Sequence, residues 1–377
     1  MAKIPVGILG ATGEVGQKFV VSLQRHPWFQ ITELFASERS AGKSYADALE
    51  YGGESSRWFV KETPDEKILD MEVIDVRNAP SEEASFFFSA LPSETALEAE
   101  GKIAKEKPVI STASAYRYFD DSFTYLPSIN DQHVKIIETQ RENRDWNGFV
   151  VPQPNCTTIG LVMSLKPIHG KFGLERVTMT SLQSVSGAGY AAVRSWTEQR
   201  RVQRSILPEG MNDFTTGTFE GNVIPYIKGE EEKVRKETTQ LLGEFVDGKI
   251  IPADFKIACK CNRVPVFEGH TESVFIETKK KCSVEELKKL WKTYQGEPQR
   301  MKLPTAPMQP IIVTEAIDRP QPRFDSDTQG GMVTIIGGVE PNDFGFQYTV
   351  LSHNIELGAA KGAVLAAEYI HKIGLIK

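Results

Sequence analysis

The fold of this chain is decided by residues 3–16, which read Lys3-Ile4-Pro5-Val6-Gly7-Ile8-Leu9-Gly10-Ala11-Thr12-Gly13-Glu14-Val15-Gly16. The first half of the stretch is apolar, glycine recurs at every third position from residue 7 to residue 16, and an amphipathic segment continues to about residue 25. This pattern predicts a buried strand, a tight turn and a helix. Small residues in such a turn let the backbone approach a pyrophosphate, which then lies on the helix N-terminus. We therefore predict a dinucleotide-binding turn; the alternative is a turn that only packs a helix on a strand.

The next hundred residues continue the alternation of strand and helix. Strands are expected near residues 31–36, 72–76, 85–91 and 108–111. Helices are expected between several of them, one over residues 93–105, and a further helix over residues 131–144. Such alternation implies a parallel, doubly wound sheet. The predicted fold class is therefore α/β, with a Rossmann-type sheet in the N-terminal half.

After residue 156 the pattern changes to long strand-like runs rich in Val, Thr and Ile. They lie near residues 176–185, 256–278, 332–336 and 346–351. With a helix expected over residues 285–294, this texture predicts a mixed sheet in a second, α+β domain. The alanine-rich segment 354–370 is expected to be a helix that packs back on the first domain. We therefore expect one domain of residues 1–155 plus 354–377 and a second of residues 156–353.

The composition limits the class of protein. A formal net charge of −6 makes a general nucleic-acid surface a poor prediction. The four cysteines form no dense framework, and Cys259 and Cys261 lack partners in metal-ligand spacing, so we expect a reduced protein without a metal site. The chain runs from Met1 straight into a strand and has no apolar run of membrane-spanning length. These features predict a cytoplasmic protein with no membrane partner.

Cys156 is the residue whose surroundings point most directly to chemistry. It lies in the segment Val151-Pro152-Gln153-Pro154-Asn155-Cys156-Thr157-Thr158, where a predicted strand gives way to a predicted helix. A thiol at a helix N-terminus faces unpaired N–H groups, which favour the thiolate. Gln183 and His270 follow in other segments. A thiolate, a histidine and a dinucleotide suggest oxidation of an aldehyde, or the reverse, through a thioester; the alternative is a cysteine that only fills the core.

The segment after the second predicted strand indicates which dinucleotide is bound. An enzyme that uses NAD would usually show an acid there for the ribose hydroxyl. This chain instead offers two hydroxyls and two cations, which suit a 2′-phosphate: Ser37, Ser40, Arg39 and Lys43. Glu38 is the one residue that argues for NAD. We predict NADP.

Together these motifs resemble the aspartate-semialdehyde dehydrogenase family, in particular its archaeal and fungal branch. The resemblance extends over nearly the whole chain. Besides the cysteine segment, it rests on residues Gly7–Gly13, Ala36–Lys43, Phe88–Ser93, Ser111–Arg117, Ser186–Tyr190, Tyr226–Lys233, Cys261–Val266, Gly269–Ser273 and Asp318–Arg323. It implies NADPH-dependent reductive dephosphorylation of L-aspartyl 4-phosphate to L-aspartate 4-semialdehyde, on the route to lysine, threonine and methionine. It also implies a homodimer or homotetramer.

The resemblance implies a role for each matching residue. Cys156 would be the nucleophile that carries the thioacyl group, His270 the general acid/base and Gln183 the residue that orients the substrate. Arg263 would hold the substrate α-carboxylate and Glu230 its ammonium, while Arg117 and Lys233 would hold phosphate. The cofactor-binding residues would be Gly10, Thr12, Gly13, Val15, Ser37, Arg39, Ser40, Ser89, Leu91, Ser186, Gly187 and Asn354.

Three stretches depart from the family pattern. They are an arginine-rich insertion at Arg194–Arg204, the segment Gly337–Glu340, and the segment Asn354–Gly358. The insertion could meet the phosphates of coenzyme A, which keeps an acyl-CoA reductase such as malonyl-CoA reductase as the alternative. That enzyme's substrate has no ammonium to meet Glu230, which favours the amino-acid substrate. A non-catalytic NADP sensor is the alternative from another class, and the complete set of catalytic residues argues against it.

Overall fold

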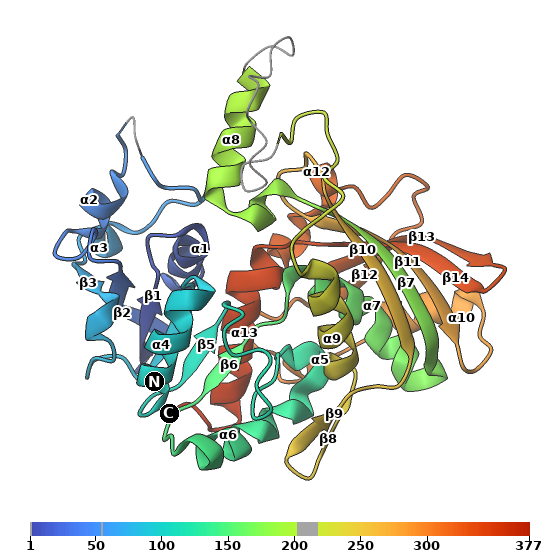
Figure 1. The fold of residues 1–377 in the computed structure, drawn as a ribbon, viewed down its shortest axis with the longest axis horizontal. Coiled ribbons are helices and arrows are strands. Elements are labelled where there is room, and N and C mark those ends of the chain that lie inside the picture. The colour runs from blue at the N-terminus through green and yellow to red at the C-terminus, as the bar shows by residue number, and fades with distance from the viewer. Residues whose placement is uncertain (1, 54–55, 202–217) are drawn as a thin grey trace.

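The computed structural model describes residues 2–53, 56–201 and 218–377, and it contains two large sheets (Figure 1). The first is a six-stranded sheet in the order β3-β2-β1-β4-β5-β6, in which every described pair is parallel. Its strands are β1 Ile4–Leu9, β2 Phe29–Ala36, β3 Val73–Asp75, β4 Phe86–Ser89, β5 Val109–Ser111 and β6 Val150–Pro152. This order, with helices α1 Glu14–Leu23 and α4 Ser93–Ala104 between strands, confirms the predicted doubly wound sheet.

The glycine-rich turn joins β1 to α1 as the sequence predicts. Gly10 has a positive φ of 78°, which favours glycine. A Cβ atom at Gly16 would lie 2.1 Å from the carbonyl oxygen of Gly10, so any larger residue would push the helix off the turn. The helix N-cap, Gly13, has no side-chain capping bond, so the first N–H groups of α1 are open toward the carboxyl end of the sheet.

The second sheet is mixed and has the order β10-β7-β11-β14-β13-β12. Its strands are β7 Leu174–Gln183, β10 Lys256–Arg263, β11 His270–Thr278, β12 Ile311–Val313, β13 Thr334–Asn342 and β14 Gly345–Ser352. Helices α7 Cys156–Phe172 and α10 Val284–Lys292 pack against this sheet, and the indole N–H of Trp291 on α10 donates to the Ser164 carbonyl at 2.8 Å. Alternation along β7 leaves Leu182 exposed on the face away from the buried side, and Phe275 of β11 is exposed likewise.

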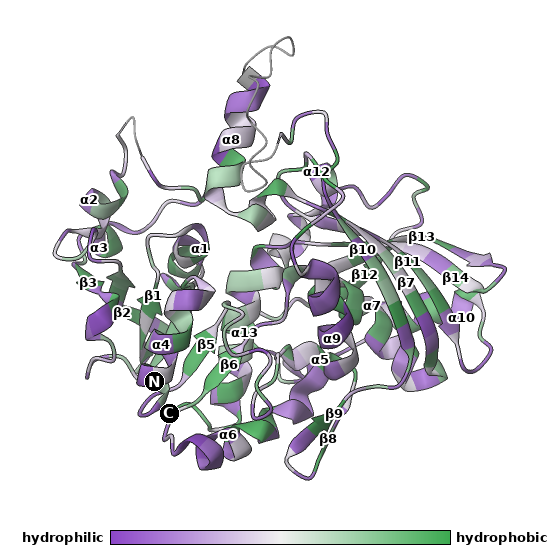
Figure 2. Cartoon of the chain, in the orientation of Figure 1, coloured by the Kyte–Doolittle hydropathy of each residue, from purple (hydrophilic) through white to green (hydrophobic). Residues whose placement is uncertain are grey.

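Hydropathy follows this layering. Green, hydrophobic residues concentrate in the strands of the first sheet, and helix α9 Glu230–Leu241 is mostly purple (Figure 2). No helix among the described residues is long and apolar enough to cross a membrane.

Shorter elements complete the fold. The helices are α2 Tyr45–Leu49, α3 Glu66–Leu69, α5 Pro127–Asn130, α6 Ile136–Arg144, α8 Tyr190–Arg201, α11 Glu297–Arg300 and α12 Pro322–Asp325. Single 3₁₀ turns span Val76–Asn78, Asp131–Lys135, Val185–Ala188 and Thr328–Gly331. A two-stranded hairpin is formed by β8 Glu244–Val246 and β9 Lys249–Ile251. The end of the arginine-rich insertion, residues 202–204, lies outside the described residues.

Three details of the predicted elements are wrong. The expected strand over residues 256–278 is two strands, because the chain leaves the sheet after Arg263 and returns at His270 on the other side of β7. The expected helix over residues 131–144 begins with a 3₁₀ turn. The last helix does not begin at Asn354: a π-helical turn occupies Glu356–Ala360, and the regular helix α13 spans Lys361–Lys372, where it packs against β5 and α1.

Candidate active site

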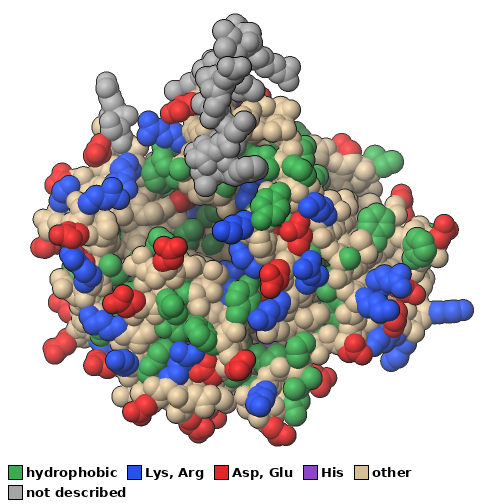
Figure 3. All heavy atoms as spheres, in the orientation of Figure 1, with side chains coloured by type: hydrophobic (Ala, Val, Ile, Leu, Met, Phe, Trp, Pro, Cys, Tyr) green, Lys and Arg blue, Asp and Glu red, His purple; other side chains and the backbone are tan. Residues whose placement is uncertain are grey.

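The candidate active site is a cleft of about 810 Å³ at the carboxyl end of the first sheet. Figure 3 shows a hollow in this face of the molecule, with Lys and Arg side chains along one wall. Its lining includes most of the residues that the sequence predicts: Thr12, Gly13, Val15, Leu91, Arg117, Cys156, Gln183, Ser186, Gly187, Glu230, Lys233, Arg263 and Asn354. His270, Gly10, Ser37, Arg39, Ser40 and Ser89 do not line it.

Cys156 is the first residue of α7, as predicted, and Asn155 caps that helix. The Asn155 side-chain oxygen accepts from the N–H groups of Thr157 at 3.0 Å and Thr158 at 3.2 Å. The rest of α7 is almost wholly buried, so the core holds the helix axis in place. The position of the thiol is therefore set by the cap and by the packing of the whole helix. A Cβ atom at Gly358 would lie 3.0 Å from the Cys156 Cβ, so the π-helical turn leaves no room for a side chain there.

His270 lies behind the thiol, at the start of β11. Its Nε2 is 3.2 Å from the Cys156 Sγ, and the ring is fully buried. Its Nδ1 accepts from the Ser184 N–H at 3.2 Å. Because Nδ1 acts as an acceptor, the proton of the neutral ring lies on Nε2 and points at the sulfur. Sequence reasoning did not identify Ser184, which fixes this tautomer.

The electrostatics of the thiol differ from the expectation based on its helix position. Burial, and after it the Glu230 carboxylate, raise the pKa of Cys156 to about 11, although Arg263, Arg117 and the Thr157 N–H act to lower it. Burial, together with Arg263 and His353, holds the pKa of His270 well below its usual range. The helix N-terminus alone would lower the pKa of Cys156 and favour the thiolate, but burial of the sulfur raises this pKa by more. These shifts favour the neutral form of both the thiol and the imidazole.

Glu230 is a buried carboxylate at the start of α9. It accepts from Asn155 Nδ2 at 2.9 Å and Gln183 Nε2 at 3.2 Å, and Lys233 Nζ lies 3.6 Å away. Glu230 and Lys233 therefore form an i,i+3 ion pair in the first turn of α9. Three side chains from two segments of the sequence donate to one oxygen, Oε1 of Glu230: Asn155 and Thr157 at the start of α7, and Gln183 at the end of β7.

Two arginines line the same cleft. Arg263 Nη1 donates to the Ser184 carbonyl at 2.7 Å, and burial lowers the pKa of Arg263 from its usual value. Arg117 lies 3.3 Å from the fully buried Glu237. Glu237 also accepts from the Asn155 N–H at 2.6 Å and the Tyr118 hydroxyl at 2.7 Å. Sequence reasoning did not identify Glu237, although it follows Glu230 by seven residues and so shares its helix face.

The residues predicted to bind the cofactor fall into two groups. Asn354 does not cap a helix: its side chain accepts from the Gly269 N–H at 2.8 Å and donates to Ser186 Oγ at 2.9 Å. Ser37, Arg39 and Ser40 instead lie in the turn after β2, outside the cleft. There Ser37 and Arg39 are exposed, and Ser40 is buried. Glu38, the residue that argued for NAD, pairs with Arg77 at 3.0 Å.

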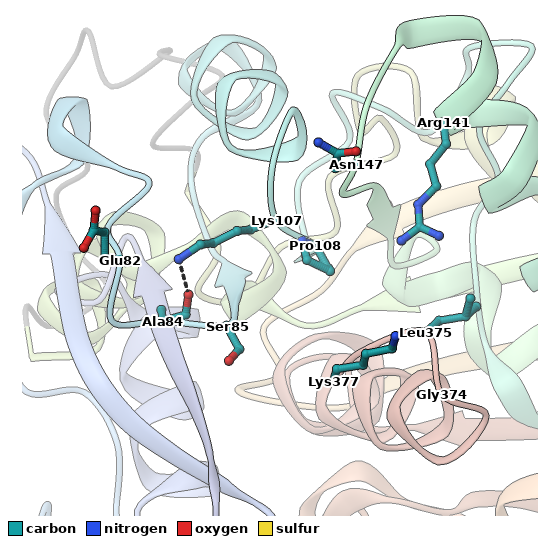
Figure 4. Close-up of a pocket in the computed structure, with 10 residues that line it drawn as sticks. All are labelled: Glu82, Ala84, Ser85, Lys107, Pro108, Arg141, Asn147, Gly374, Leu375 and Lys377. Carbon is teal, nitrogen blue, oxygen red and sulfur yellow. Dashed lines mark hydrogen bonds between the residues drawn. The ribbon is translucent and has the colours of Figure 1, made fainter.

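Two other features are separate from this site. Among the described residues, Glu268, Asp327 and His353 are a group with metal-ligating side chains close together, within 4.8 Å. However, the Lys61 ammonium lies 3.2 Å from the Asp327 carboxylate, so one of the three groups is already paired with a cation. A second cavity, of about 540 Å³, is lined by residues near the amino ends of β4 and β5, among them Ala84, Lys107 and Arg141 (Figure 4). It lies at the opposite edge of the sheet from Cys156 and contains none of the predicted site residues.

Comparison with known proteins gives two family models along the chain. The model of the semialdehyde dehydrogenase NAD-binding domain matches residues 5–137, and that of the semialdehyde dehydrogenase dimerisation domain matches residues 165–356. The aspartate-semialdehyde dehydrogenase of Archaeoglobus fulgidus is 43% identical over 98% of this chain and 99% of its own. That of Methanothermobacter thermautotrophicus is 39% identical, also over 98% and 99%. The crystal structure of the Candida albicans aspartate-semialdehyde dehydrogenase with NADP is 32% identical, with a TM-score of 0.83 over 99% of this chain and 100% of that one.

Proposed function

The chain belongs to the aspartate-semialdehyde dehydrogenase family, and we propose that it converts L-aspartyl 4-phosphate to L-aspartate 4-semialdehyde with NADPH. The observation that carries this proposal is the contact of 3.2 Å between Cys156 Sγ and His270 Nε2 in a cleft that also presents Glu230, Arg263 and Lys233. A nucleophile, a proton donor and charges of both signs suit a zwitterionic acyl phosphate.

The residues of this chain divide the chemistry among them. The Cys156 thiol loses its proton as its sulfur attacks the acyl carbon and the C–S bond forms. The bond to phosphate breaks, and phosphate leaves with its electron pair and takes up that proton. A dinucleotide held at the turn between β1 and α1 would supply hydride chemistry at the carbonyl carbon of this thioester. The C–S bond then breaks and the sulfur leaves as thiolate. His270 holds a proton on Nε2 beside the sulfur, so it can give that proton to the sulfur or to an adjacent oxygen and take it back.

The charged residues hold the substrate in this scheme. Arg263 presents a rigid guanidinium for the α-carboxylate, and Glu230 a carboxylate for the ammonium. Lys233 and Arg117 supply positive charge for the phosphate, and Gln183 orients the acyl group beside Cys156. Glu230 already contacts Asn155, Gln183 and Lys233, so the substrate ammonium would exchange with these partners rather than meet an unpaired carboxylate.

The cofactor we propose is NADP. The turn at Gly10 and Gly16 has no room for side chains, and the open N-terminus of α1 faces the cleft, as a diphosphate requires. Ser37, Arg39 and Ser40 follow β2, where the adenosine ribose lies in this class of fold. The relative from Candida albicans was solved with NADP. Arg39→Ala should weaken NADPH binding more than NADH binding; equal affinity of the native protein for both would favour Glu38 as a ribose ligand.

We also propose how the chain is divided and assembled. Residues 1–155 plus 354–377 would form the NADP-binding domain, and residues 156–353 the catalytic and dimerisation domain. A second copy would cover the exposed face of the second sheet, where Leu182 is 40% and Phe275 43% exposed. Phe275→Glu should therefore shift the protein toward monomer in light scattering, whereas Phe344→Glu, in the β13–β14 turn, should not. With all four cysteines free, we place this biosynthetic enzyme in the reduced cytoplasm.

One assay separates this function from the alternatives. Phosphate-dependent reduction of NADP by L-aspartate 4-semialdehyde is measured beside oxidation of NADPH by malonyl-CoA, with Cys156→Ala as the inactive control. We expect the first reaction and not the second. Arg194 lines the cleft and is the observation that favours a coenzyme A substrate. Malonyl-CoA reduction without semialdehyde activity would establish the acyl-CoA reductase, and NADPH binding without either activity would indicate a sensor.

A further inference from the structure

A buried glutamine fastens residues 57–59 to the nucleotide turn. Gln17 lies on α1 and is 0% exposed. Its Nε2 donates to the Thr12 carbonyl at 3.0 Å and to the Arg57 carbonyl at 2.8 Å, and its Oε1 accepts from the Phe59 N–H at 2.8 Å. A buried amide with its donors and acceptor satisfied by backbone groups is costly to disturb. The segment is therefore fixed at the N-terminus of α1, although it is forty residues away in the sequence.

The same segment touches the other half of the molecule. The ring of Phe59 stacks on the ring of Tyr190, with centroids 3.4 Å apart and planes inclined by 21°. Tyr190 is the first residue of α8, directly after the Ser186–Gly189 turn that borders Cys156 and His270. Both rings line the cleft. The stack thus joins the nucleotide-binding side to the catalytic side across the cleft mouth.

Arg57 adds a charge at this place. Its side chain is exposed, lines the cleft, and has no carboxylate within ion-pair distance among the described residues. Glu14, in the first turn of α1, also lines the cleft. Burial and Glu268 raise the pKa of Glu14 to about 7, so its charge is partly suppressed at neutral pH. With the Arg57 side chain directed toward it, the N-terminus of α1 therefore has a net positive charge, which favours the binding of an anion.

We propose that Arg57 binds the diphosphate of the dinucleotide and that the Phe59–Tyr190 stack, held by Gln17, covers it. This proposal rests on the proposed function only in requiring a dinucleotide in the cleft. The anchoring explains the choice of the diphosphate. Gln17 donates to the backbone carbonyls of both Thr12 and Arg57, which places the backbone of Arg57 near the N-terminus of α1. The 2′-phosphate, by contrast, is proposed to lie after β2, at Arg39.

The test measures dissociation constants of NADPH and NADH by fluorescence titration. Arg57→Ala should weaken both cofactors about tenfold, because both carry a diphosphate and a charged hydrogen bond is lost. Arg39→Ala should weaken only NADPH, and Arg176→Ala, an exposed arginine on β7 outside the cleft, should weaken neither. A selective loss of NADPH in Arg57→Ala would assign Arg57 to the 2′-phosphate and overturn the proposal.

The stack is tested by a second pair of variants. Phe59→Ala should raise the KM for NADPH about threefold to tenfold with kcat nearly retained, while Tyr190→Phe, which keeps the ring, should change it less than twofold. Thermal unfolding without cofactor should be unchanged in Arg57→Ala and Tyr190→Phe, because neither removes a packed ring, whereas Phe59→Ala should lose about 0.5–1.5 kcal/mol with the stack. Wild-type activity with unaltered cofactor affinity in Arg57→Ala and Phe59→Ala would refute this inference alone. A wild-type protein without semialdehyde activity would instead refute the proposed function, and NADPH binding would still report on Arg57.

Discussion

Asn155 offers the sharpest test of how the nucleophile is positioned. Its side chain caps α7 through Thr157 and Thr158 and donates to the buried Glu230. Loss of a cap costs about 1 kcal/mol, and loss of a hydrogen bond to a charged group costs about 1.5–3 kcal/mol. Asn155→Ala should therefore lower the free energy of unfolding by about 2.5–4 kcal/mol. At about 2.1 cal/mol/K per residue, a chain of 377 residues should lose about 3–5 °C in Tm.

Asn155→Ser separates the two contributions, because a serine can still cap the helix but cannot reach Glu230. Its loss should be about 1 kcal/mol smaller than that of the alanine variant. Turnover should fall in the same order, with NADPH affinity retained, since Cys156 is the next residue. Calorimetry and steady-state kinetics on the three proteins check this. Equal stability of the serine and alanine variants would show that the cap contributes nothing, and an alanine variant as stable as the wild type would refute the whole account.

Three further outcomes follow from the site. Cys156→Ala should abolish turnover with an unchanged NADPH dissociation constant, and substantial residual turnover would remove the cysteine from the mechanism. Because burial raises the pKa of Cys156 to about 11, its alkylation by iodoacetamide in the empty enzyme should rise about tenfold per pH unit from pH 7 to 10; a plateau near pH 8 would contradict this. Glu272 is fully buried, neither of its oxygens has a hydrogen-bond partner among the described residues, and burial raises its pKa well above the usual value. The folded state therefore keeps a proton that the unfolded state releases above about pH 4.5, so the free energy of unfolding of the wild type falls as pH rises. Glu272→Gln has no such carboxyl. Its free energy of unfolding relative to the wild type, measured by urea unfolding, should therefore increase between pH 4.5 and pH 8. A difference that does not change with pH would show that Glu272 is ionised in the fold.

Local patterns predicted the parts of this molecule that depend on local physics. The glycines of residues 7–16 predict β1 and α1, because the turn between them requires small residues at positions that are close together in the sequence. The start of α7 at Cys156 follows from the residues around it in the same way. Asp247-Gly248 is a strong hairpin signal, and the β8–β9 hairpin turns there with positive φ at both residues.

The remainder of the site depends on contacts between distant segments. Ser184, Glu237 and Gln17 act through partners 86, 82 and 40 residues away. No periodicity within one element reports such distances. The protonation of the thiol is a further example. A helix N-terminus lowers the pKa of a cysteine, whereas burial raises it. How deeply the sulfur is buried depends on the folded chain and cannot be read from the neighbouring residues.

The neutral state of the Cys156–His270 pair has a consequence for the survival of the enzyme in a cell. Peroxides attack the thiolate far faster than the thiol. A nucleophile that stays protonated in the empty cleft is therefore shielded from oxidative damage during the time between turnovers. The positive charges of Arg263 and Arg117 lower the pKa of Cys156. A ligand that rearranges these two side chains therefore also changes the fraction of thiolate, and with it the rate of oxidation of the sulfur. Inactivation by peroxide should accordingly depend on which ligand occupies the cleft, and the resting enzyme should be the resistant form.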